Sequence, residues 1–351
     1  MRTMANMKSM TMTEPAAWQW CRRSFRAMNT DVHLSLAARE PQAQLRLVEE
    51  SFRYFEQLLS RFRPDSELSR FNASGADAFQ ASTDFFAAVQ AALWAAQQTA
   101  GIYDPTILDY LEEAGYDRTF SAITDPRPLT KDNGMDAGAA APSSTLVCGE
   151  TYGLFCLDPF SQLIWRPPGL RIDLGGMGKG WTVDRVADAL CQEGHFLLNA
   201  GGDLYAYGTN GLEKGWDVHL ALPFDDALTY ATLVVDHHAV ATSTTARRRW
   251  MKDGFVQHHL IDPRTGRPAQ TDAVSVSVVA GRAFTAEIYA KTALILGIQE
   301  GLAFLDSLPE VEGILFSEAR EVYLTNTADR FLMRLDPAGY RPPSTIYATA
   351  G

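Results

Sequence analysis

A glycine-rich loop that runs directly into a helical pattern is the feature that restricts this chain most. It reads "DLGGMGKGWTVDRVADAL" and covers residues 173–190. The phosphate-loop pattern fails because Lys179 is followed by Gly180 instead of Ser or Thr, and the dinucleotide fingerprint fails because Trp181 stands where its third glycine belongs. Backbone N–H groups of such a loop still attract an anion, and the helix dipole favours negative charge there. Two common nucleotide-binding motifs are therefore excluded, while phosphate binding and a tight strand-to-helix turn both remain open.

The other patterns mix helices with hairpin-linked strands. Residues 31–38 alternate apolar and polar side chains, as in a half-buried strand, and residues 44–62 carry apolar side chains at helical spacing. A second helix is expected over 83–101, with Thr83 or Asp84 as its N-cap. The later segments are expected to be strands at 153–158, 162–167 and 170–175, a helix from about residue 180, strands between 195 and 280, helical structure over 284–309 and a hairpin over 312–326. This order predicts an α+β (mixed α/β) class, with mixed and antiparallel sheets flanked by helices.

One internal boundary stands out. Residues 124–146 are rich in Pro, Gly, Ala and Ser without periodicity, which predicts a long loop or insertion. It separates an N-terminal α/β part, residues 21–123, from a main α/β part, residues 147–335. Residues 1–20 are expected to form a mobile N-terminus, and residues 336–351 a tail.

Charge and hydropathy narrow the classes of partner. The formal net charge of −11 argues against a general nucleic-acid binder, because phosphate backbones need a basic face. A local basic pocket is compatible with it. No apolar run is long enough for a signal peptide or a membrane span, so we expect a cytoplasmic protein without membrane insertion.

Two segments carry side chains suited to acid–base chemistry. Asp203 follows Gly201 and Gly202 at the end of an apolar run, where it is either a turn residue or a carboxylate held at a strand end. His258 and His259 would face opposite sides of a strand, so at most one of them points into any one site. A buried structural histidine is the alternative interpretation.

Taken in order, seven segments resemble the FAD:protein FMN transferases, the ApbE-like family. They are "FRAMNTDV", "LSRFRPDSELSRFN", "GIYDPTILDYL", "DLGGMGKGWTVD", "LLNAGGDLYAYG", "ATST" and "HHLIDPRTGRP", and they span most of the chain. The resemblance implies an ApbE-like fold and an enzyme that passes FMN from FAD to a Thr or Ser hydroxyl of a target protein, with release of AMP. FAD and an acceptor protein are then the expected partners.

The resemblance also implies the residues of the site. Those expected to contact FAD are Met28, Phe62, Tyr103, Asp104, Asp173, Lys179, His259 and Ile261. Phosphoryl transfer needs a proton acceptor and positive charge on the non-bridging oxygens. His259 or Asp203 is the expected acceptor, and Lys179 with the amides of the glycine loop the expected source of charge.

Magnesium is the further cation that the resemblance implies. Relatives hold it with a loop carbonyl, here that of Gly176, and with an Asp and a Thr one helical turn apart, here Glu287 and Lys291. Glu287 and Lys291 lie on one helix face in the favourable order for an ion pair, which by itself indicates only a solvated pair. Because a protonated Lys cannot ligate magnesium, we expect the Lys291 ammonium, paired with Glu287, to replace the metal in part.

Two alternative functions share the same pocket. Water in place of the hydroxyl acceptor would make the chain an FAD pyrophosphatase that yields FMN and AMP. The altered cation site would alternatively leave a non-catalytic FAD-binding protein.

Overall fold

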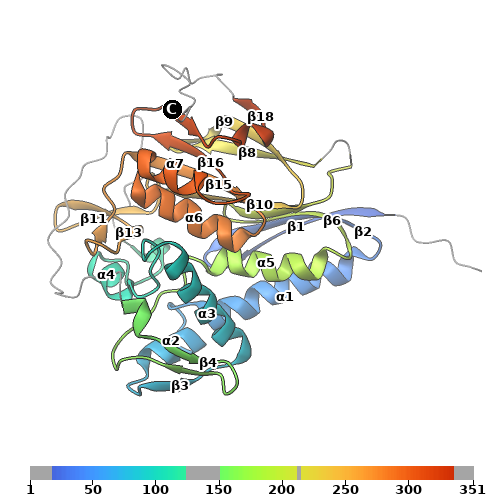
Figure 1. Cartoon of the computed structure of the whole chain (residues 1–351). Coiled ribbons are helices and arrows are strands. Elements are labelled where there is room, and N and C mark those ends of the chain that lie inside the picture. The colour runs from blue at the N-terminus through green and yellow to red at the C-terminus, as the bar shows by residue number, and fades with distance from the viewer. Residues whose placement is uncertain (1–17, 124–150, 212–214, 336–351) are drawn as a thin grey trace, which may run out of the picture.

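The structure is a computed structural model that describes residues 18–123, 151–211 and 215–335 (Figure 1). The loop or insertion expected at 124–146, the tail at 336–351 and most of the expected mobile N-terminus lie outside these ranges. Residues 19 and 20 of that N-terminus instead begin the first strand. No helix in the described ranges combines the length and apolar character that crossing a bilayer requires.

A single eight-stranded sheet forms the centre of the fold. Its strands, in spatial order, are β1 (Gln19–Ala27), β2 (Thr30–Ala38), β6 (Gly194–Ala200), β7 (Asp203–Tyr207), β10 (His238–Thr244), β15 (Ala273–Ala280), β16 (Glu312–Ser317) and β17 (Val322–Leu324). Every neighbouring pair is antiparallel. Strands from before and after residues 124–150 therefore share one sheet, and the α+β class is confirmed.

Both faces of this sheet are covered. Helices α1 (Pro41–Leu59), α5 (Gly178–Leu190) and α6 (Ala283–Leu296) pack on one face, and Ala239 and Ala241 of β10 point into that layer. A three-stranded sheet of β18 (Leu332–Leu335), β9 (Asp225–Val235) and β8 (Trp216–Leu222) covers the other, where Val240 points. Because both layers exclude water, β15 is buried at every residue, whereas a one-faced strand would alternate.

The remaining elements extend the layers around the sheet. They are α2 (Glu67–Ala73), α3 (Thr83–Gln98), α4 (Leu108–Glu113), α7 (Ile298–Asp306), the three-stranded sheet of β3 (Ala78–Gln80), β5 (Leu163–Trp165) and β4 (Cys156–Asp158), and the two-stranded pairs β11 (Arg249–Lys252) with β12 (Phe255–His258) and β13 (Ile261–Asp262) with β14 (Arg267–Pro268). In Figure 1, α2, α3, β3 and β4 form the lower end of the molecule.

Local details differ from the sequence expectations in three places. Residues 170–175 are not a strand, because the Asn72 side chain takes both the N–H and the carbonyl of Ile172, at 2.9 and 2.8 Å. Ser82, not Thr83 or Asp84, caps α3, since its hydroxyl accepts from the N–H of Phe85. The expected helical stretch over 284–309 is two helices, divided at residue 297.

Candidate functional site

One large cavity collects the residues predicted from the sequence. It has a volume of about 1310 Å³, above the ~300–1,000 Å³ of most small-molecule sites. All of the predicted site residues line it, namely Met28, Phe62, Tyr103, Asp104, Asp173, Gly176, Lys179, Asp203, His259, Ile261, Glu287 and Lys291. The structure thus brings them together from segments far apart in the chain.

Two tight hairpin turns deliver residues to this cavity. Met28 and Asn29 join β1 to β2 with φ values of 51° and 57°, a left-handed conformation that Asn tolerates better than most residues. Gly201 and Gly202 join β6 to β7 with φ values of 66° and 100°. Asp203 is the first residue after this turn, so its carboxylate is fixed at the start of a strand, as one of the two sequence interpretations had it.

Contacts of the Asp173 carboxylate fix the start of the glycine loop. Arg61 Nε lies 2.9 Å from Asp173 Oδ1, and the N–H of Gly175 donates to Asp173 Oδ2 at 3.0 Å. Helix α5 then begins at Gly178. A Cβ on Gly180 would lie 2.5 Å from the carbonyl oxygen of Ala283, so α5 and α6 cross too closely for Ser or Thr here. This crossing explains why the phosphate-loop pattern breaks at this position.

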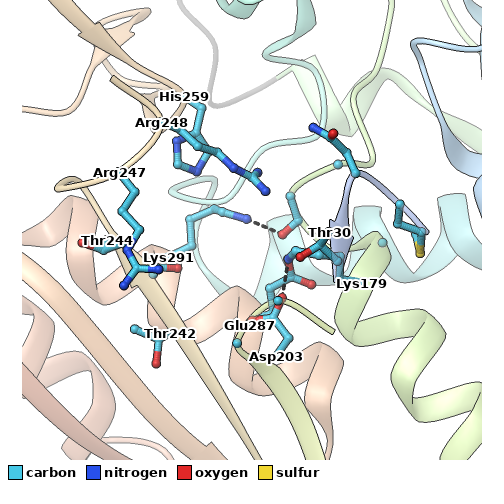
Figure 2. Close-up of a pocket in the computed structure, with 18 of the residues that line it drawn as sticks. Thr30, Lys179, Asp203, Thr242, Thr244, Arg247, Arg248, His259, Glu287 and Lys291 are labelled. Carbon is cyan, nitrogen blue, oxygen red and sulfur yellow. Dashed lines mark hydrogen bonds and ion pairs between the residues drawn. The ribbon is translucent and has the colours of Figure 1, made fainter. Parts of the chain in front are cut away.

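A buried cluster of charges occupies the crossing of α5 and α6. The Lys179 ammonium donates to Asp203 Oδ2 and, at 2.6 Å, to Glu287 Oε1 (Figure 2). The second oxygen of Glu287 accepts from the N–H of Gly180 at 2.8 Å. The Lys291 ammonium donates to the carbonyl of Gly176. The prediction of an ion pair between Glu287 and Lys291 is therefore wrong. The Glu287 carboxylate pairs with Lys179 instead, because α5 places Lys179 against the face of α6.

These contacts set the protonation states of the cluster. Burial opposes the charge on Lys179, but the Asp203 and Glu287 carboxylates hold its pKa above the ordinary value. Burial, together with the nearby Glu287 carboxylate, raises the pKa of Asp203 to about 6. Burial lowers the pKa of Lys291, and Glu287 counteracts part of that change. Asp203 consequently titrates close to neutral pH, where a proton acceptor is most effective.

Only His259 of the two neighbouring histidines faces the cavity, although β12 ends at His258 and the two residues do not share a strand as the sequence predicted. His259 lines it, while His258 Nε2 lies 3.1 Å from the carbonyl oxygen of Ala269. Burial and the nearby charge of Arg248 hold the pKa of His259 well below its ordinary range, which leaves the imidazole neutral. Within the described part of the chain, His259 Nδ1 and the Tyr103 hydroxyl are buried without a hydrogen-bond partner. Both atoms are available to a bound molecule.

Basic residues that the sequence reasoning missed also line the cavity. Arg61 lies over the rings of Phe62 and Tyr116, at 4.1 and 4.8 Å from their centroids. Arg248, with a φ of 49°, lies beside His259 in Figure 2. The signal for Arg248 is the run of three arginines after "ATSTTA", and the signal for Arg61 is its place beside Phe62. The lining of the cavity thus includes both basic and acidic side chains.

The residues at the implied magnesium position do not suit that ion. Within the described ranges, no three His, Cys, Asp or Glu side chains group closely enough to hold a metal. The Gly176 carbonyl already accepts from an ammonium, and both Glu287 oxygens have donors. Magnesium prefers an octahedron of oxygens, which a lysine cannot join.

Comparisons with known proteins agree on one family. The model of the ApbE family matches residues 28–315. A FAD:protein FMN transferase of Salmonella typhimurium (strain LT2) is 30% identical over 273 residues, which are 73% of this chain and 74% of that protein. Another, from Klebsiella pneumoniae (strain 342), is 31% identical over 179 residues, and the match spans about half of each protein, 50% of this chain and 54% of the relative.

The fold has a close counterpart among solved structures. The crystal structure of the ApbE protein from Thermotoga maritima has a TM-score of 0.78 and 22% sequence identity, and the match covers 90% of this chain and all of that one. The chain described above therefore has the same fold as that structure.

Proposed function

Because the chain belongs to the ApbE family, we propose that it transfers FMN from FAD to a Thr or Ser hydroxyl of a target protein and releases AMP. The observation that supports this most is the charge arrangement of the cavity. Two ammonium groups lie at the glycine loop, beside a carboxylate that titrates near neutral pH. Such an arrangement suits a diphosphate and a hydroxyl that must lose a proton.

In the proposed step the hydroxyl oxygen of the acceptor attacks the phosphorus of the FMN half of FAD. A new P–O bond forms, the bond from that phosphorus to the bridging oxygen breaks, and AMP leaves with the bridging oxygen. The hydroxyl proton passes to a base in the cavity. Lys179 and Lys291 stabilise the charge that develops on the non-bridging oxygens, whereas the N–H groups of Gly175, Gly178 and Gly180 already donate within the protein.

Asp203 is the better of the two expected bases. Its pKa of about 6 lies near the working range, whereas the pKa of His259 is far lower and makes the imidazole a weak acceptor. We then assign His259 to a hydrogen bond with FAD at the cavity wall, and the Tyr103 hydroxyl to a second such bond. We assign Met28, Phe62 and Ile261 to the packing of the ring systems of FAD.

The experiment follows both products of the transfer. Purified protein is incubated with FAD and an extract of the source cells, AMP is measured by chromatography, and flavin fluorescence is read in a denaturing gel. AMP together with a fluorescent protein band supports the transferase, and a Thr→Ala or Ser→Ala change in that acceptor must remove the band. AMP with equal free FMN and no band indicates the pyrophosphatase, and retained FAD without AMP indicates the carrier.

Two narrower expectations belong with this proposal. The cytoplasmic location stays a prediction from the sequence, which fractionation of source cells tests. The Thr or Ser acceptor site likewise awaits the mass of the labelled peptide. No step of the proposed reaction uses magnesium, because the residues at its position do not suit the ion.

A further inference from the structure

We propose that the Lys291 ammonium serves as the resident cation at the diphosphate, so that this chain binds and uses FAD without a divalent metal. The inference rests on the proposed function for the identity of the ligand. The contacts of Lys291, Lys179 and Glu287 support it.

The ammonium already occupies the position where a metal would contact the loop. Lys291 Nζ donates to the carbonyl of Gly176, and a Cβ on Gly176 would lie only 2.8 Å from that nitrogen. Lys291 also lies 5.8 Å from the centroid of the Tyr103 ring, a second contact that favours a cation there. A metal bound to the Gly176 carbonyl would have to displace this ammonium.

The carboxylate beside it is likewise engaged. Glu287 Oε1 is 2.6 Å from Lys179 Nζ, and Glu287 Oε2 is 2.8 Å from the N–H of Gly180. A metal would therefore have to break the ion pair with Lys179 or share an oxygen with it. The two ammonium groups and the two carboxylates of Asp203 and Glu287 form a cluster of no net charge.

Before the diphosphate binds, a divalent ion would give this buried cluster two uncompensated positive charges, which is unfavourable away from water. A diphosphate needs positive charge in the same place, and Lys291 supplies it without a metal, because its ammonium contacts an uncharged carbonyl whereas Lys179 contacts both carboxylates. The Lys291 side chain comes from α6 and the receiving carbonyl from the glycine loop, so the cation is fixed by the fold before FAD arrives.

The first test measures metal binding and needs no turnover. Manganese(II) is titrated into the wild-type protein and into Lys291→Thr, and the free ion is followed by electron paramagnetic resonance. We expect no saturable site in the wild type and a saturable site in the variant, with an affinity at least about tenfold above any residual wild-type binding, because removing the ammonium leaves two carboxylates with the single ammonium of Lys179. Lys252→Thr is the matched control, since Lys252 also donates to a backbone carbonyl, that of Glu113, but outside the cavity.

The second test measures AMP release from FAD with EDTA or with magnesium chloride. We expect the same wild-type rate in both, and a Lys291→Met rate that falls about a hundredfold and is not restored by metal. Lys291→Thr should regain activity with magnesium only. Circular dichroism and thermal melts establish that the variants are folded, and the wild-type measurements stand without them.

A wild-type protein that binds manganese stoichiometrically and loses AMP release in EDTA would overturn the inference while leaving the transferase intact. Absence of AMP from every sample would instead contradict the proposed function, and the manganese titration would still decide whether Lys291 excludes the metal.

Discussion

A single carboxylate, Asp203, carries the clearest prediction for one residue. Its pKa is raised to about 6 by burial and by Glu287, and only the ionised form accepts a proton. The rate of AMP release should therefore be full above pH 7 and fall as the pH drops through about 6. Asp203→Asn should lower the rate about 10²–10⁴-fold and remove this acid limb. The measurement is the pH–rate profile with FAD and an acceptor.

Asp77→Asn is the control for this change, because Asp77 is exposed and does not line the cavity. An Asp203→Asn protein with the wild-type profile would rule out Asp203 as the base. If His259→Gln then abolished the rate, the imidazole would be the proton acceptor.

Residue types at the site were predictable from the sequence, but their partners were not. The ordered motifs led to much of the cavity lining, because each motif keeps its residue types and spacing, but not to Arg248 or to the lining residues of β8. The pairing of Glu287 with Lys291 was wrong because helical spacing considers only neighbours on one helix. Lys179 reaches Glu287 from another helix, and local pattern holds no information about that crossing.

At the scale of elements, the crossing of α5 and α6 depends on Gly180. A methyl group there would lie 2.5 Å from the Ala283 carbonyl oxygen, so the helices would have to move apart. Gly180→Ala should lower the free energy of unfolding by at least about 1 kcal/mol, even though alanine favours helix by about that amount. Urea denaturation measures the change. Gly75→Ala is the control, since nothing lies within 4 Å of its added Cβ.

A stability of Gly180→Ala equal to that of wild type would show that the crossing has room. The contact between Lys179 and Glu287 would then not depend on a close approach of the two helices. The explanation of the broken phosphate-loop pattern would also fail.

The start of α6 carries a prediction about pH. Asp184 accepts from the N–H groups of Ala283 and Phe284 at 2.7 and 3.0 Å, and burial, opposed by Arg282, raises its pKa to about 6. Because the folded state favours the protonated form, this group's contribution to stability is complete below about pH 4 and is lost as the pH rises through 6. The loss is about 3 kcal/mol.

Asp184→Asn cannot ionise, so the stability of the wild type relative to this variant should decline between pH 4 and pH 7. Urea melts of both proteins across that interval measure it. A constant difference between the two would contradict the raised pKa of Asp184.

Elements with a strong period were predicted correctly, whereas elements set by tertiary contacts were not. The alternation at 31–38 and the helical spacing at 44–62 correspond to β2 and α1. Residues 170–175 have a strand-like composition, but the N–H and carbonyl of Ile172 bond to the side chain of Asn72 instead of to a neighbouring strand. Asn72 is distant in sequence. The helical stretch divides at Gly297, whose φ of 87° ends α6, and an apolar pattern on both sides conceals such a break.

At the scale of the whole molecule, FAD should contact parts of the cavity lining that lie together only in the folded chain. A ligand that binds the native state alone stabilises it by about 2.7 kcal/mol at a hundred times its Kd. For a chain of this size that corresponds to a rise in Tm on the order of 5 °C. Differential scanning calorimetry with FAD measures it, and riboflavin, which lacks the phosphates, is the control. Equal shifts with both would contradict a diphosphate subsite at the glycine loop.

The class of the molecule followed from the order of its patterns, but the order of its strands did not. Nothing in the sequence of β2 shows that β6 lies beside it, or that β17 is the strand at the far edge of the sheet. Antiparallel partners are selected by complementary buried faces, and many alternating strands offer similar faces.

The residues that line the cavity come from segments far apart in the sequence, which has a consequence for synthesis on the ribosome. Met28 and Tyr103 emerge early, whereas Lys291 and the rest of α6 are translated after most of the chain. A nascent protein in which α6 has not yet been made therefore lacks part of the pocket, and no Lys291 ammonium lies against its glycine loop. The complete pocket, with both lysines at the glycine loop, forms only after α6 has been made and has packed against α5.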